Sequence, residues 1–127
     1  MEPETKLEAM TYLPQAQSNK PPHIANNNAF LGDVVSTCRN TKFDADAPIS
    51  AGFYRQEKGT ELVYTYKYHE TKIILEGSFF IRDHATGKEV KATPGDVFYF
   101  PKGSTITFRS DDYGLAFYTG QRKEGDV

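Results

Sequence analysis

The sequence has little of several features that would assign it to a specialised class of protein. No stretch approaches the roughly 20 consecutive apolar residues that cross a bilayer, and residues 1–10 lack the basic start and apolar run of a signal peptide. The 15 basic and 17 acidic residues leave a formal net charge of -2, so no charge excess favours a nucleic acid or an anionic membrane. We therefore expect a cytoplasmic protein with neither partner.

Cysteine is nearly absent as well, since Cys38 is the only one in the chain. A lone cysteine forms no internal disulfide and offers no second thiol for a zinc site. A free cysteine usually behaves as a small apolar side chain. We expect Cys38 to be buried.

The chain of 127 residues fits one domain. Residues 1–28 hold four of the seven prolines and show no sustained periodicity, which predicts an irregular N-terminal arm or tail. Such an arm is either disordered or lies across a neighbouring subunit. The predicted barrel spans residues 29–122, and residues 123–127 form a C-terminal tail.

From Ala29 onward, short runs rich in Val, Ile, Tyr, Phe and Thr alternate with turns rich in Gly, Pro, Asn and Asp. This pattern, with no convincing helix, predicts an all-β barrel or sandwich. The predicted strands are Phe30–Ser36, Ile49–Arg55, Leu62–Tyr68, Thr71–Arg82, Glu89–Ala92, Asp96–Phe100, Thr105–Phe108 and Leu115–Thr119.

Two segments carry a resemblance to a known family. Gly95–Gly103 reads as a glycine, five residues, a proline, one residue and a glycine, while Glu70–Gly77 reads as a glutamate, six residues and a glycine. In this order the pair resembles the cupin superfamily, which implies a small double-stranded β-helix or jelly-roll barrel. Between Phe30 and Arg122 the chain is similar to the ethanolamine-utilisation Q-type cupins. That closer resemblance implies a histidine-poor barrel and a homodimer, and we carry over no reaction from it.

The resemblance also locates the family's metal-ligand positions. The two histidines that precede the glutamate fall on Tyr64 and Tyr66, and the third falls on Ile106. Of the four ligand positions, only Glu70 therefore retains the family's ligand residue. An isoleucine supplies no lone pair, and the metals of cupins are bound mainly by neutral imidazoles. We therefore expect no cofactor and no standard metal. The alternative is a transition metal held through Glu70 and His69, which requires a local strand bulge.

Alternation along the strand after Tyr68 places Glu70 and Lys72 on one face and His69 on the other. The family match implies that the Glu70 face looks inward. Glu70, Lys72 and Tyr66 then form an acid and base set without a metal, which suits an isomerase, dehydratase, cyclase or lyase. In this hypothesis Glu70 takes a proton from carbon, and Lys72 or a tyrosine stabilises the enolate. Lys72 forming a Schiff base is an alternative.

Further ligand-binding candidates surround this set: Tyr64, Tyr68, His69, Tyr99 and Tyr118. The last two lie on predicted wall strands, where tyrosines are often half-buried structural residues. Two other functions stay open. One is a non-catalytic module that binds a small molecule in the same cavity, and the other is a structural protein whose barrel is filled by side chains.

Overall fold

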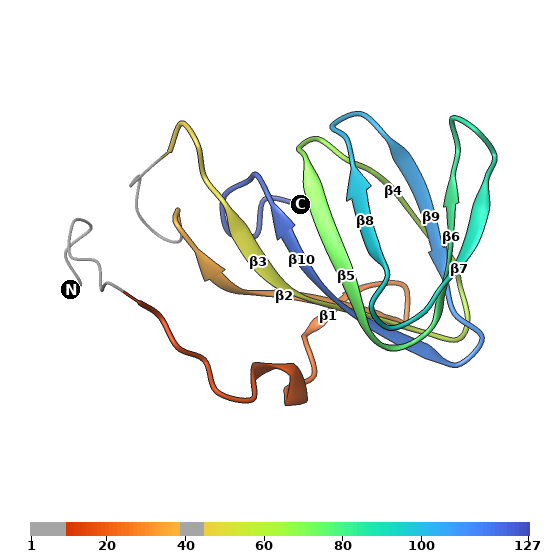
Figure 1. The fold of residues 1–127 in the computed structure, drawn as a ribbon, viewed down its shortest axis with the longest axis horizontal. Coiled ribbons are helices and arrows are strands. Elements are labelled where there is room, and N and C mark those ends of the chain that lie inside the picture. The colour runs from red at the N-terminus through yellow and green to blue at the C-terminus, as the bar shows by residue number, and fades with distance from the viewer. Residues whose placement is uncertain (1–9, 39–44) are drawn as a thin grey trace.

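The computed structural model describes residues 10–38 and 45–127. Within these ranges the strands form two antiparallel sheets that pack around a shared core (Figure 1). Sheet A contains, in spatial order, β1 (His23–Ala25), β2 (Ala29–Ser36), β3 (Ser50–Glu57), β10 (Tyr113–Gly120), β5 (Glu70–Gly77) and β8 (Val97–Phe100). Sheet B contains β4 (Leu62–Thr65), β9 (Thr105–Arg109), β6 (Phe79–Asp83) and β7 (Glu89–Ala92). The all-β fold class is confirmed.

The core between the sheets is largely aromatic. The ring of Tyr54, on β3, stacks on Phe79 at 5.8 Å and meets the ring of Phe108 edge to face at 5.4 Å. These rings come from both sheets, so their contacts hold the sheets together. Helix is confined to one short 3₁₀ turn, η1 (Ala16–Ser18), and no helix of the described ranges is long and apolar enough to cross a membrane.

The predicted strand Thr71–Arg82 is wrong in one respect, because it is two strands. Gly77 has a φ of +63°, and a Cβ on it would lie 2.0 Å from the carbonyl oxygen of Tyr113. Only glycine tolerates both conditions without strain. At this residue the chain leaves sheet A and enters sheet B as β6, so one apolar run contributes to both walls.

The described part of the predicted arm, residues 10–28, is more regular than the sequence indicates. It contains η1 and β1, which pairs antiparallel with β2, and the N–H of Leu31 donates to the carbonyl of Pro22 at 2.8 Å. The predicted tail also returns to the barrel, where the N–H of Gly125 donates to the Asp33 carboxylate at 2.8 Å. Residues 22–25 of the arm and Gly125 of the tail therefore lie against the barrel, and Cys38 is buried as expected.

Candidate functional site

A cavity of about 280 Å³ lies in the barrel, mainly between the facing sheets. Five aromatic rings line it, and aliphatic side chains from β1, β2 and β4 complete the wall together with Val127. The rings belong to Tyr54, Tyr64, Tyr66, Tyr68 and Phe108. Its charged lining residues are Glu70 and Lys72. The cavity is therefore largely apolar, with one carboxylate and one ammonium in its wall.

Glu70 and Lys72 form a buried ion pair. Alternation along β5 points both side chains inward, as predicted, and both are about 4% exposed. The Lys72 Nζ lies 3.2 Å from Glu70 Oε2, and the Tyr66 hydroxyl donates to the same oxygen at 2.6 Å. Burying a charge is costly unless it is paired and hydrogen-bonded, and here the carboxylate has both kinds of partner.

The ammonium of Lys72 also lies among aromatic rings. Its Nζ is 4.7 Å from the ring centre of Tyr54 and 4.9 Å from that of Phe108. Two further rings, Tyr118 and Phe100, lie at 5.7 and 5.8 Å. Ring faces attract a cation at these distances. The surroundings of Lys72 therefore suit an electrostatic role better than attack on a carbonyl carbon as a neutral amine.

Two tyrosines beside the pair, Tyr66 and Tyr68, remain protonated. Burial raises the pKa of the Tyr66 hydroxyl well above its usual value, and the charge of Glu70 raises it further. Burial also raises the pKa of Tyr68, to which the hydrogen bond with Tyr64 adds. The hydroxyl oxygens of Tyr64 and Tyr68 are 3.1 Å apart. At neutral pH Tyr66 and Tyr68 therefore give and accept hydrogen bonds without carrying charge.

The structure brings together only some of the residues that the sequence singled out. Glu70, Lys72, Tyr66, Tyr64 and Tyr68 meet at the cavity. The other three lie outside the cavity. The convergence of five residues from one stretch of chain follows from β5 and the bend that precedes it.

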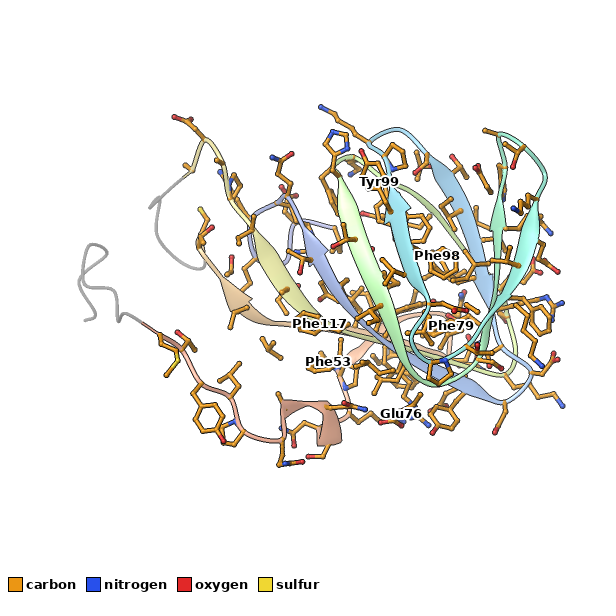
Figure 2. The ribbon with its side chains drawn as sticks, viewed as in Figure 1. Phe53, Glu76, Phe79, Phe98, Tyr99 and Phe117 are labelled. Carbon is orange, nitrogen blue, oxygen red and sulfur yellow. The ribbon has the colours of Figure 1, made fainter. Side chains whose placement is uncertain are left out.

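His69, Tyr99 and Tyr118 do not line the cavity. Tyr99 is 57% exposed on the outer face of β8, while its neighbour Phe98 packs against the core (Figure 2). His69 is exposed beside it, because no bulge turns its side chain inward. Its Nδ1 lies 2.9 Å from the Tyr99 hydroxyl. Tyr118 is buried, but its hydroxyl donates to Asp33 at 2.6 Å.

Sequence reasoning missed a second buried ion pair, Asp33–Arg122. Two guanidinium nitrogens of Arg122 each donate to a different carboxylate oxygen of Asp33, both at 2.8 Å, and both side chains are buried. Burial opposes ionisation of Asp33, but hydrogen bonds from Arg122 and Tyr118 prevail and lower its pKa. The guanidinium lies 5.4 Å from the ring centre of Tyr68. This pair therefore supports the cavity wall from behind.

The residues at the family's metal positions do not fit a standard cupin metal. Ile106 is buried and apolar, and the Tyr66 hydroxyl is already bonded to Glu70. The ammonium of Lys72 lies beside the carboxylate, where a metal would have to bind. In the described ranges no group of three His, Cys, Asp or Glu side chains converges, and Glu70 and His69 point to opposite faces.

Comparison with known proteins identifies relatives of this barrel. The family described as ethanolamine utilisation protein EutQ matches residues 9–120. The acetate kinase EutQ of Escherichia coli K12 is 35% identical over 65 residues, which cover 51% of this chain and 27% of that protein. The chain thus matches about a quarter of the length of that relative.

Two solved structures are similar to most of this chain. A crystal structure of a putative ethanolamine utilisation protein Q from Salmonella typhimurium LT2 has 28% identity and a TM-score of 0.60, covering 76% of this chain and 71% of that one. An RmlC-like cupin from Shewanella frigidimarina has 15% identity and a TM-score of 0.64, covering 94% and 96%. These likenesses confirm the cupin fold.

Proposed function

The chain belongs to the ethanolamine utilisation protein EutQ family, and from this premise we propose that its barrel binds a small molecule and acts on it with Glu70, Lys72 and Tyr66. One observation carries the proposal. A carboxylate and an ammonium, 3.2 Å apart and buried, line a cavity of about 280 Å³. Titratable groups that converge in a largely apolar pocket are the usual mark of a binding or active site.

The chemistry we propose is abstraction of a proton from a carbon next to a carbonyl group. The C–H bond breaks, the proton goes to the Glu70 carboxylate, and the electron pair forms a carbon–carbon double bond as the carbonyl electrons move to oxygen. The Lys72 ammonium, next to Glu70, stabilises the resulting enolate oxygen. Return of the proton to another carbon gives an isomerase, and loss of a group from the neighbouring carbon gives a lyase or dehydratase.

Tyr66 acts as a positioning residue in this proposal. Its hydroxyl donates to Oε2 of Glu70 at 2.6 Å, the oxygen that also faces Lys72. Both contacts go to one oxygen, so the carboxylate is held in a fixed orientation. Fixing the base before the substrate arrives reduces the entropy lost in the transition state.

A non-catalytic binding module is the second candidate. Oε2 of Glu70 already contacts both the Lys72 ammonium and the Tyr66 hydroxyl, and an oxygen occupied in this way favours binding without turnover. The cavity volume counts against the third reading, a filled structural barrel.

Deuterium exchange separates the two main candidates. A thermal-shift screen against ketones, carboxylates and phosphates first identifies compounds that bind. Each binding ketone is then kept in D₂O with the protein, and loss of its α-proton signal is followed by ¹H NMR. We expect exchange above the buffer rate, lost in Glu70→Gln and kept in Glu76→Gln, a control on the same strand whose side chain bonds Tyr113 outside the cavity.

The outcomes have distinct meanings. A thermal shift with exchange at the buffer rate leaves a binding module. Exchange that persists in Glu70→Gln removes the general-base role. No shift with any compound class contradicts the proposal that this cavity binds a small molecule.

A further inference from the structure

We propose that the cavity selects an uncharged ligand with an aromatic body of about ten non-hydrogen atoms and a carbonyl or amide oxygen at one end. The inference rests on the proposed function, because it names the ligand class of the same cavity. It follows from the net charge of the lining, the arrangement of the rings and the hydrogen-bond donors that the pocket presents.

The first argument is electrostatic. The charges of Glu70 and Lys72 cancel within the pair, and no other charged side chain of the described residues lines the cavity. The Arg122 guanidinium behind Tyr68 is balanced by Asp33. A charged ligand would therefore give up its water without gaining an opposite charge that is still unpaired, which is costly in a buried site. A neutral ligand avoids this cost.

The second argument is the shape of the wall. The rings of Tyr64 and Tyr66 lie 4.8 Å apart at 88°, and those of Tyr66 and Tyr68 lie 5.6 Å apart at 83°. Neighbouring rings at right angles present a face beside an edge, which are the two surfaces that an inserted aromatic ring contacts. A cavity of about 150 Å³ holds benzene. The volume of about 280 Å³ here leaves room for a ring with a short polar substituent.

The third argument is the type of polar group that the pocket offers. The Lys72 ammonium has only hydrogen-bond donors. Tyr64 and Tyr68 share one hydrogen bond, in which one hydroxyl donates and the other keeps its own hydrogen for a further acceptor. Both sites call for an acceptor on the ligand, and a carbonyl or amide oxygen supplies one without adding charge.

Calorimetric titration with three matched probes tests the inference: benzamide, benzoate and benzylamine, the last as its ammonium ion at pH 7. They share one ring and differ in charge. We expect the wild-type chain to bind benzamide at least tenfold more tightly than either ion. Glu70→Gln leaves a net positive pocket and should shift the benzoate-to-benzamide affinity ratio at least tenfold toward benzoate. Lys72→Met should shift preference toward benzylamine in the same way.

Glu76→Gln is the matched control, because it removes a carboxylate from the same strand without changing the cavity, and its ratios should equal those of the wild type. Benzoate or benzylamine binding to the wild type as tightly as benzamide overturns the inference but leaves small-molecule binding standing. Failure of all three probes, together with no thermal shift from any ketone, carboxylate or phosphate, overturns both. The wild-type comparison decides alone if a cavity variant does not fold.

Discussion

Replacing Glu70 and Lys72 singly and together separates a pair kept for stability from a pair kept for function. Both side chains are about 4% exposed. Removing one partner of a buried ion pair costs about 3–5 kcal/mol, because the other charge stays buried without compensation. We therefore expect Lys72→Met and Glu70→Gln each to lose about that much free energy of unfolding.

The double variant should recover most of the loss. It contains no uncompensated charge, Met suits a site among four aromatic rings, and Gln still accepts a hydrogen bond from Tyr66. Apolar or neutral replacement of a buried pair is often neutral or stabilising. We expect its free energy of unfolding to exceed that of either single variant by at least about 2 kcal/mol.

Urea unfolding followed by far-UV circular dichroism and tyrosine fluorescence measures these values, since the chain has no tryptophan. A double variant that loses the sum of the two single losses would refute the coupling argued here. Ligand binding is then measured on the stable double variant. Loss of binding without loss of stability assigns the pair to function, whereas binding that survives favours a structural pair.

Further predictions concern the Asp33–Arg122 pair, the metal content and the oligomeric state. Asp33→Asn leaves Arg122 buried without a counter-charge and should lower the free energy of unfolding by about 3–5 kcal/mol at pH 7. The control Asp111→Asn, at a surface ion pair, should lower it by about 0–1 kcal/mol, and urea unfolding measures both. The pKa of Asp33 is lower in the folded than in the unfolded chain, so its contribution to stability is complete above the unfolded pKa and disappears as pH falls through the folded pKa. Asp33→Asn should therefore weaken the fall of the free energy of unfolding at acid pH. Dialysis against EDTA should leave ligand binding unchanged, and stoichiometric transition metal in the purified protein together with lost binding would contradict the reading of the site. Two exposed apolar residues that pair across β5 and β8, Ile73 (37% exposed) and Val97 (70% exposed), favour a homodimer. Light scattering should therefore show a dimer, which Val97→Lys converts to a monomer. A monomeric wild type would disprove this prediction.

Strand positions were most predictable where a turn directly precedes or follows the strand. The strand expected at Glu89–Ala92 is identical to β7, and β9 differs from its prediction by one residue, because Pro and Gly turns precede or follow these runs. Strand β1 was not predicted, since three residues between prolines and asparagines give no period. The break at Gly77 was missed because apolar residues continue on both sides of it and only the backbone there departs from a strand.

The candidate site shows a similar division. The two-residue period predicted that Glu70 and Lys72 share one face, the family resemblance implied that this face looks inward, and both side chains are buried. The same period on β8 places Phe98 and Phe100 inside and therefore Tyr99 outside, which the sequence reasoning did not apply. The Asp33–Arg122 pair joins residues 89 positions apart, and no local pattern marks a contact of that range.

The tyrosines at the family's histidine positions and the lysine beside Glu70 act on the same property of the barrel, the charge next to the glutamate. By resemblance, a metal-binding cupin holds a divalent cation next to this glutamate, which leaves positive charge for an anionic ligand atom. In this chain the cation next to Glu70 is the Lys72 ammonium, at 3.2 Å, and its single charge equals that of the carboxylate. Tyr66 completes the arrangement with a neutral donor where an imidazole would bind metal. The exchange of a metal for a tethered ammonium therefore removes the surplus charge, and with it the reason for such a barrel to prefer anions.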